Sequence, residues 1–262
     1  MIAIGALAVF MPGCSLVNKL RAKNDLNEGV REYNRGRYAV AQQQFETALD
    51  LDPNNANAQL FYARAVNAQF EQKQNEESGL KTAEAYENII KHNKDNDKAV
   101  DQALAFESHV FEQLATINPD KADEYKNKQY NLLLKRADLP SADEKTKAAV
   151  YYTIGRDYWQ EAYNISKQYT KNGMQQGAIP SNAVAKLKPL NMKAHENLSK
   201  ALANEPDYAD AWAISKLVYI QDRMIESNPA RKAEIEAKIN EANDNAKKFY
   251  DLQKQAAAQG GQ

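Results

Sequence analysis

The sequence has few of the residues that cross-link or interrupt a chain. Its 262 residues include one cysteine, 10 glycines and 8 prolines. A single cysteine cannot form an intramolecular disulfide, which excludes a disulfide-stapled domain. No stretch alternates Val, Ile and Thr between turn residues as β-strands do. No apolar run reaches the roughly 20 residues that a transmembrane helix needs. These absences leave a helical fold without membrane-spanning helices.

Neither sign of charge dominates the chain. The 34 basic and 35 acidic residues give a net charge of -1, so there is no overall electrostatic attraction to nucleic acid. Hydrophobic residues are 43% of the total and charged residues 26%, which is typical of a folded protein. Abundant Ala, Gln, Lys and Glu favour helices. The composition therefore predicts an all-α protein, with no nucleic acid among its partners.

The chain also lacks the motifs that carry chemistry. There is no glycine-rich phosphate loop, no nucleophile elbow and no cysteine–histidine pairing. His92, His109 and His195 lie on three separate predicted helices, without the spacing of a metal site. The carboxylates fall among lysines on helix faces. We therefore expect no enzyme activity, no cofactor and no metal, and we interpret each histidine as a surface or hydrogen-bonded residue.

A helical hairpin is predicted near the N-terminus, in the segment NEGVREYNRGRYAVAQQQFETALDLDPNN. Two short helices flank a turn at Asn34–Arg37. Residues at spacings of three and four form one apolar stripe on the second helix, and Pro53 follows its end. The stripe consists of Tyr38, Ala41, Phe45, Ala48 and Leu49.

This hairpin resembles the tetratricopeptide repeat (TPR), a helix-turn-helix unit of 34 residues. Gly29 matches the family's close-packing glycine, and the match continues through Gly36, Tyr38, Ala41, Phe45, Ala48 and Pro53. Asp25 and Glu32 stand where the family has first-helix aromatics. A second match lies downstream, at Tyr151, Ile154, Gly155 and Tyr158, then Ala194, Leu198, Ala201 and Pro206, then Trp212 and Tyr219.

The middle of the chain matches the family less closely. We predict helices near 55–74, 80–92, 96–117 and 120–136, separated by breaks at Gly79, Asn93–Asp97, Pro119 and Pro140. The last helix is predicted at roughly 230–257. The resemblance then implies about ten helices in five repeats, stacked as a TPR-like right-handed superhelical solenoid over 24–257. Residues 258–262 are expected to be a disordered tail.

One long interruption separates the two helices of the fourth repeat. Residues 171–189 contain two glycines and two prolines, which predicts an inserted loop with at most one short helix. Two interpretations remain open for this loop. It is either a tolerated insertion or a segment that folds over the groove and contacts a ligand.

The inner surface of TPR proteins is formed by first-helix positions that the core does not need, and the resemblance implies that these positions bind partners. Of the residues it places there, we select as partner-binding Tyr33, Asn34, Arg64, Asn67, Tyr152, Arg156, Trp159 and Gln160. Tyr, Trp and Arg are common anchors of protein interfaces. The alternative for Trp159 is that it packs under the inserted loop.

The N-terminus carries an apolar run, Ile2–Phe10, followed by Met11-Pro12-Gly13-Cys14. This segment resembles a bacterial lipoprotein signal, in which a small residue precedes the lipid-modified cysteine. The resemblance implies a signal peptide at 1–13, lipidation of Cys14 and a tether at 14–23, with Ser15 favouring the outer membrane. No Lys or Arg precedes Cys14, so residues 1–13 as an ordinary extension of the first helix remain an alternative.

Together these features predict a non-catalytic protein-interaction scaffold. We expect a TPR lipoprotein of the bacterial envelope that is anchored to the membrane, faces the periplasm and assists assembly of a membrane or secretion complex. One alternative is a periplasmic small-ligand or peptide carrier with a pocket under loop 171–189, beside Trp159. Another is a cytoplasmic TPR adaptor.

Overall fold

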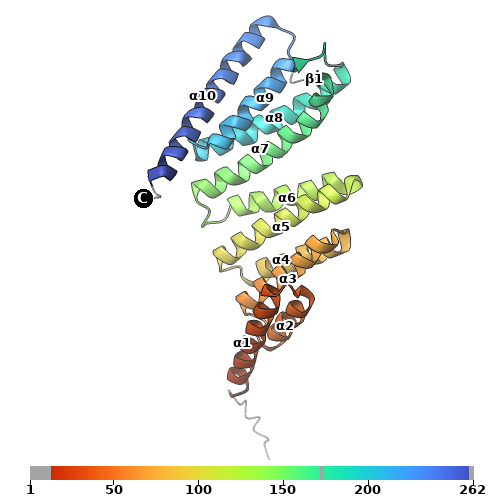
Figure 1. Cartoon of the computed structure of the whole chain (residues 1–262), viewed down its shortest axis with the longest axis vertical. Helices are drawn as coiled ribbons and strands as arrows, with labels where there is room; N and C mark the ends of the chain where they lie inside the picture. Colours follow the sequence, from red (N-terminus) through yellow and green to blue (C-terminus); the bar gives the residue numbers. More distant parts are fainter. Residues whose placement is uncertain (1–12, 172–173, 260–262) are drawn as a thin grey trace, which may run out of the picture. The chain divides into compact units, whose positions relative to one another are not determined.

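The computed structural model describes residues 13–171 and 174–259, which form two compact units. Unit 1 holds the described residues up to Lys135 with Leu139–Ser141, and unit 2 holds Arg136–Asp138 and the described residues from Ala142 onward. The predicted all-α class is confirmed, because ten α-helices account for almost all of the described residues. Figure 1 shows consecutive helices lying side by side within each unit.

Unit 1 is built from the first six helices, apart from the last two residues of α6. They are α1 (Gly13–Asn34), α2 (Tyr38–Leu51), α3 (Ala56–Lys73), α4 (Glu76–His92), α5 (Asp97–Ile117) and α6 (Ala122–Ala137), with a 3-10 turn at Pro119–Lys121. Helix α1 packs against α2, α2 against α3, α3 against α4 and α4 against α5. This succession of neighbouring helices confirms the predicted helix-turn-helix plan in unit 1.

Unit 2 is built from the last four helices and a small hairpin. The helices are α7 (Glu144–Ser166), α8 (Ser181–Asn204), α9 (Ala209–Ile225) and α10 (Pro229–Gln259). A 3-10 turn at Lys167–Tyr169 leads into strands β1 (Thr170–Lys171) and β2 (Met174–Gln175), which pair antiparallel. Helix α7 packs against α8, and α9 against α10, as the repeat plan predicts.

Short polar side chains determine where four of the helices begin. Asn55, Asn75, Asn96 and Asp143 each precede a helix and accept a hydrogen bond from the backbone N–H three residues further on. Such caps satisfy amide groups that have no partner inside the helix. The loops of this chain are therefore rich in Asn and Asp because those residues start the next helix.

The turn between α1 and α2 explains why Glu32 replaces a family aromatic. Glu32 is 5% exposed and accepts hydrogen bonds from the guanidinium groups of Arg37, at 2.6 Å, and Arg35, at 2.8 Å. The bond from Arg37 is the main reason that the pKa of Glu32 lies below its ordinary value. Gly36 has a φ of 75° and so supplies the left-handed residue that the turn requires. At this position, where the family has an aromatic side chain, Glu32 is therefore held by hydrogen bonds to the two arginines of the turn.

The two glycines that carry the repeat resemblance lie at close helix crossings. A Cβ atom on Gly29 would lie 2.4 Å from the Phe45 ring, and one on Gly155 would lie 2.8 Å from Leu198 Cγ. Neither position has room for a side chain. The predicted stripe on α2 is confirmed as well, since Ala41, Phe45 and Ala48 are fully buried.

Gly79 does not break a helix, contrary to the prediction. It lies inside α4, where an added Cβ would come within 2.6 Å of Leu114 and 3.0 Å of Phe70. The break falls earlier, at Gln74, which adopts a left-handed φ of 48°, and at the cap residue Asn75. Gly79 is therefore another close-packing glycine. A glycine is needed there because neighbouring side chains pack against α4, not because the chain turns.

The inserted segment is shorter than predicted. The non-helical residues end at Pro180, and 181–189 are the first turns of α8, with Pro189 inside the helix. An internal proline costs a helix about 3 kcal/mol. Ala183 and Leu187 on the same turns are buried against Ala162 and Ile179, and this burial offsets the cost.

The ends of the described chain also differ from the predicted boundaries. Residues 14–23, expected as a tether, are the first turns of α1, and Ala22 is fully buried against Ala48 and Ala58. At the other end α10 continues to Gln259, two residues beyond the predicted helix. Residues 1–12 of the predicted signal peptide and 260–262 of the predicted tail lie outside the described residues.

Candidate functional site

Two surfaces rich in aromatic rings and arginine stand out, one in each unit. We call the first the Arg64 surface, formed by Tyr33, Arg64, Asn67, Glu71 and Phe106 on α1, α3 and α5. We call the second the Arg156 surface. It is formed by Tyr152 and Arg156 on α7, Tyr208 immediately before α9, Asp210 on α9 and Tyr250 on α10.

Arg64 lies between two aromatic rings. Its Cζ atom is 5.7 Å from the centre of the Phe61 ring and 5.9 Å from that of Phe106. Phe106 is 38% exposed and stacks on the buried ring of Tyr86, at a centroid distance of 5.4 Å. Within the described residues, no carboxylate forms an ion pair with Arg64. Its half-buried guanidinium is therefore held in place by rings, and its donors remain available to a partner.

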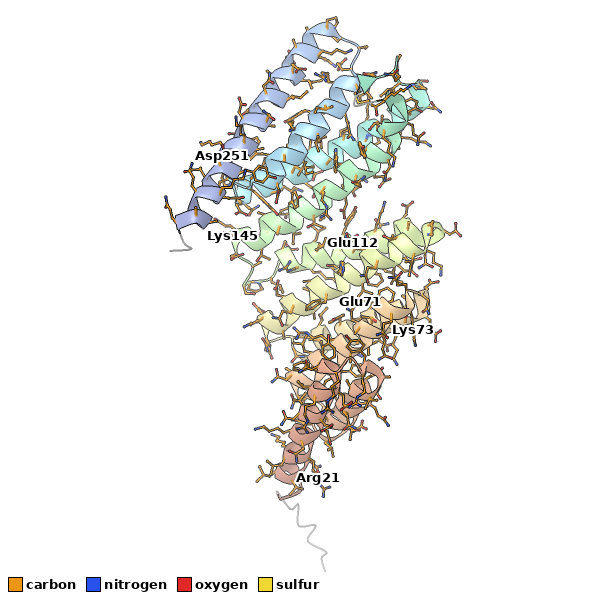
Figure 2. All side chains as sticks on the ribbon, in the orientation of Figure 1. Arg21, Glu71, Lys73, Glu112, Lys145 and Asp251 are labelled. Atoms are coloured by element: carbon orange, nitrogen blue, oxygen red, sulfur yellow. The ribbon has the colours of Figure 1, made fainter. Side chains whose placement is uncertain are left out.

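The remaining members of the Arg64 surface surround this arginine. Tyr33 is half-buried, and this burial raises the pKa of its phenol, while the nearby Arg64 charge opposes the shift. Asn67 donates a 2.8 Å hydrogen bond to Glu71. Glu71, labelled in Figure 2, adds a negative charge close to Tyr33. The surface therefore combines aromatic area, one cation and one anion, as protein interfaces commonly do.

Tyrosines dominate the Arg156 surface. Tyr152 and Tyr208 lie 4.9 Å apart between ring centres, and Arg156 Cζ lies 6.0 Å from the Tyr152 ring. Tyr250 donates a hydrogen bond to Asp210, which raises the pKa of Tyr250 to about 12. Burial raises the pKa of Tyr208 to about 12. These two phenols stay neutral and act as hydrogen-bonding, apolar surfaces.

The predicted site residues are thus distributed over both units. Tyr33 and Arg64 come together with Asn67 nearby, while Asn34 is exposed at the end of α1. Arg156 contacts Tyr152 but also pairs with Asp157 at 3.0 Å, so its charge is partly compensated. Gln160 is exposed and bonds Asn164 at 3.4 Å. The side chain of Cys14 lies outside the described residues.

Trp159 packs in a different apolar cluster from the one that contains the described residues of the inserted segment. It is half-buried against the cluster that contains Ala194, Leu198 and Val218, and it stacks on Tyr163 at 5.6 Å. The segment before α8 instead places Ile179 in a separate apolar cluster with Met224 and Ile225 at the end of α9. Trp159 and the insertion therefore serve different parts of unit 2.

Each histidine has a hydrogen-bond partner, as the sequence analysis expected. His92 lies 2.8 Å from the Asn88 carbonyl, His109 lies 2.9 Å from Glu112, and His195 lies 2.6 Å from Asp222. Among the described residues, no group of three or more His, Cys, Asp or Glu side chains is placed to bind a metal ion.

No helix of the described chain is long and apolar enough to cross a membrane.

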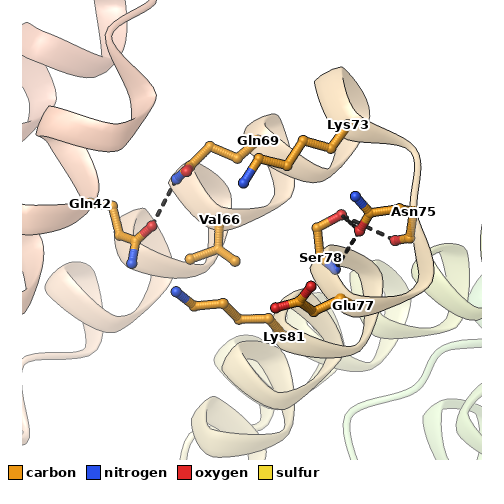
Figure 3. Close-up of a pocket in the computed structure, with 8 residues that line it drawn as sticks. All are labelled: Gln42, Val66, Gln69, Lys73, Asn75, Glu77, Ser78 and Lys81. Carbon is orange, nitrogen blue, oxygen red and sulfur yellow. Dashed lines mark hydrogen bonds between the residues drawn. The ribbon is translucent and has the colours of Figure 1, made fainter.

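Unit 1 also contains two hollows between α2, α3 and α4. Figure 3 shows the smaller, of about 170 Å³, where Lys73 and Lys81 extend from α3 and α4 beside Gln69, which donates a 2.8 Å hydrogen bond to Gln42. The larger measures about 460 Å³ and is lined mainly by apolar surface, including Leu49, Pro53 and Tyr62. The smaller hollow offers amides, two lysines and the carboxylate of Glu77, and the larger one offers apolar contact.

Several members of these surfaces could not be predicted from the sequence. Phe106 lies on α5, which carries no recognisable repeat signature, so no register could assign it to the binding face. Tyr208 and Tyr250 come from a helix cap and from α10, outside the first-helix positions that were considered. Their common signal was the frequency of Tyr, with 14 in the chain, which does not identify individual positions.

Comparisons with known proteins give no family and no function. No protein-family model matches the chain, and no curated protein matches it. Two solved structures of MamA match with TM-scores of 0.47 and 0.45 at 14% and 15% identity, covering 92% and 85% of this chain and 96% of each MamA chain. A monomeric IFIT1 mutant with Gppp-AAAA gives 0.34 at 19% identity, covering 87% of this chain and 50% of that one. At these values the similarities carry no conclusion beyond the helical architecture seen in the structure itself.

Proposed function

We propose that the chain is a non-catalytic protein-interaction scaffold. The observation that carries this proposal is the arrangement of Arg64, which is fixed between Phe61 and Phe106 without a carboxylate partner among the described residues. An ordered guanidinium loses little freedom when a partner's carboxylate or carbonyl accepts its hydrogen bonds. The Arg156 surface supplies a second aromatic area in unit 2.

The finer part of the proposal is the location. The chain is a lipoprotein of the bacterial envelope, anchored through Cys14 at the outer membrane and facing the periplasm, where it assists assembly of a membrane or secretion complex. The support is the apolar run before Cys14 and the small residue that precedes it. Two or three acyl chains on one cysteine would hold the chain firmly, whereas one chain binds only marginally.

The interface is tested by arginine replacements in the intact protein. We expect Arg64→Ala to weaken capture of the natural partner by roughly tenfold or more, since interface arginines are frequent hot spots. The matched control is Arg31→Ala, because Arg31 is exposed on α1 and pairs only with the neighbouring Glu28. Equal affinities for the two variants would contradict the Arg64 surface as an interface.

The location is tested separately by labelling in the native host. A palmitate analogue should label the wild-type chain and leave Cys14→Ser unlabelled, and the labelled form should remain with the membrane fraction. A wild-type chain that is unlabelled and cytosolic would remove the envelope proposal. The binding surfaces would then belong to a cytoplasmic adaptor.

A further inference from the structure

The first turns of α1 extend beyond the helix that covers the rest of it. Helix α1 has 22 residues, whereas its partner α2 has 14, a difference of eight residues or about 12 Å of helix. Leu16, Val17 and Leu20 on these turns are 64%, 47% and 57% exposed. A helix end therefore presents three large apolar side chains that nothing in the described chain covers.

These three side chains share one face of α1. With about 100° between successive residues, Leu16, Leu20 and Val17 span an arc of about 100°. Ala22 lies almost directly opposite the middle of that arc and is fully buried against α2 and α3. The helix is thus packed on one side and apolar on the opposite, exposed side.

Basic residues flank this apolar arc. On the helix, Lys19 and Lys23 fall on one side of it and Arg21 on the other, and all three are exposed. Figure 2 labels Arg21 in the part of α1 near the start of the described chain. The first acidic residue of the sequence is Asp25, so no carboxylate offsets these charges within the first turns.

We propose that this face, Leu16–Lys23, lies on an anionic lipid surface. Apolar side chains bordered by Lys and Arg on a helix that is too polar to span a membrane are the pattern of an interfacial helix. The three apolar side chains enter the boundary between headgroups and acyl chains, while the cations contact lipid phosphates. The inference rests on the proposed membrane location but does not need a lipid on Cys14.

The test uses full-length protein with Cys14→Ser, which removes the only cysteine. Leu20→Cys in that background is labelled with an environment-sensitive fluorophore and mixed with vesicles of phosphatidylglycerol and phosphatidylcholine in equal parts. The matched control is Leu252→Cys, because Leu252 is a 50% exposed leucine on α10. Residues 1–13 are identical in both proteins and in the variant at Lys19, Arg21 and Lys23 described below, so that variant separates their contribution from that of the helix face.

We expect the probe at position 20 to shift to the blue on anionic vesicles and the probe at position 252 to stay in water. Replacing Lys19, Arg21 and Lys23 together by Gln should weaken vesicle binding by roughly tenfold or more, with the difference lost at high salt. An unshifted probe at position 20 would overturn the inference and would assign this face to a protein partner. Lipid labelling of Cys14 without this shift would leave the proposed anchor intact, and a shift without labelling would leave the helix inference intact.

Discussion

The two units follow the same helical-hairpin plan but fill their interiors differently. Unit 1 buries its large rings, among them Tyr86 at 1% and Phe70 at 2% exposure. In unit 2 the cluster around Leu198 and Val218 consists otherwise of alanines, and the tyrosines and Trp159 pack around its edge, half-buried. One repeat plan therefore tolerates both arrangements, and aromatic rings at the edge of a core leave more ring surface available for binding.

Two carboxyl groups, one in each unit, differ in burial and in hydrogen bonding. In unit 1, Glu107 is 6% exposed and its Oε2 atom has no hydrogen-bond partner within the described part of the chain. In unit 2, the half-buried Asp222 accepts hydrogen bonds from Asn191, at 2.8 Å, and from His195, at 2.6 Å. The buried Asn191 Oδ1 and Gln221 Oε1 atoms of this unit have no partner among the described residues. An unpaired buried carboxyl opposes ionisation, whereas a carboxylate that accepts two hydrogen bonds holds its donors in place.

The largest effect should come from removing a buried ring of unit 1. Tyr86→Ala should lower the free energy of unfolding of unit 1 by about 3–5 kcal/mol, because the ring leaves a cavity. Tyr151→Ala at the edge of the unit 2 core should cost less than about 2 kcal/mol. Hydrogen exchange followed helix by helix measures both losses, and equal costs would break the contrast between the two cores.

Glu107 should make unit 1 sensitive to pH. Burial raises the pKa of Glu107 to about 7, with the charge of Glu87 adding to the shift. Its contribution to stability is therefore complete below pH 4.5 and is lost as the pH rises through 7, to a total of about 3 kcal/mol. We expect Glu107→Gln to stabilise unit 1 at pH 8 and to have little effect at pH 4.5.

The measurement for this pH effect can separate the units. Both tryptophans, Trp159 and Trp212, lie in unit 2. Urea unfolding by tryptophan fluorescence should therefore give the same transition for wild type and Glu107→Gln at every pH. Circular dichroism, which follows both units, should show the difference at pH 8. A wild-type unit 1 with no loss of stability between pH 5 and 8 would contradict the unpaired carboxyl.

The close-packing glycines should have effects confined to their own units. Gly155→Val should destabilise unit 2 by about 1–3 kcal/mol, because backbone atoms of Leu198 and Ala194 lie 3.1 and 3.2 Å from the added Cβ position. Gly29→Val should destabilise unit 1 by a similar amount through the Phe45 ring. Only Gly155→Val should move the tryptophan transition. A shift caused by Gly29→Val would show that the units do not unfold separately.

The smallest effect should come from the paired carboxylate of unit 2. Asp222→Ala should lower the stability of unit 2 by about 1–2 kcal/mol, because Asn191 and His195 lose their acceptor. Asp251→Ala is the matched control, since Asp251 is exposed on α10. Tryptophan-monitored urea unfolding measures both. If Asp222→Ala behaves like the control, the hydrogen-bond network is not stabilising.

Repeat signatures made part of the fold predictable. Gly29 and Gly155 could be assigned to helix crossings because each stands at the glycine position of a first-helix repeat pattern, and Phe45 and Leu198 stand at matching positions of the second helices. Gly79 was assigned to a break because a glycine alone does not reveal whether it turns the chain or lies against Leu114. Pro189 was assigned to a loop because the burial of Leu187, which offsets the cost of the proline, is a tertiary effect.

The candidate surfaces were predictable only in part. Arg64 and Tyr33 follow from first-helix positions, and the structure brings them together. Phe106 and Tyr250 could not be found in this way, because their helices have no repeat register and their contacts join segments far apart in the sequence. A surface built from several helices depends on how each helix is rotated, and local patterns do not specify that rotation.

Site-specific crosslinking in the native host tests the central claim most directly. A benzophenone analogue of phenylalanine would replace Phe106 on the Arg64 surface, and in a second strain Met192, which is 71% exposed on α8. We predict a protein crosslink from position 106 that Arg64→Ala reduces, and none from position 192. Crosslinks of equal strength from both positions, or from position 192 alone, would contradict a binding function for the Arg64 surface.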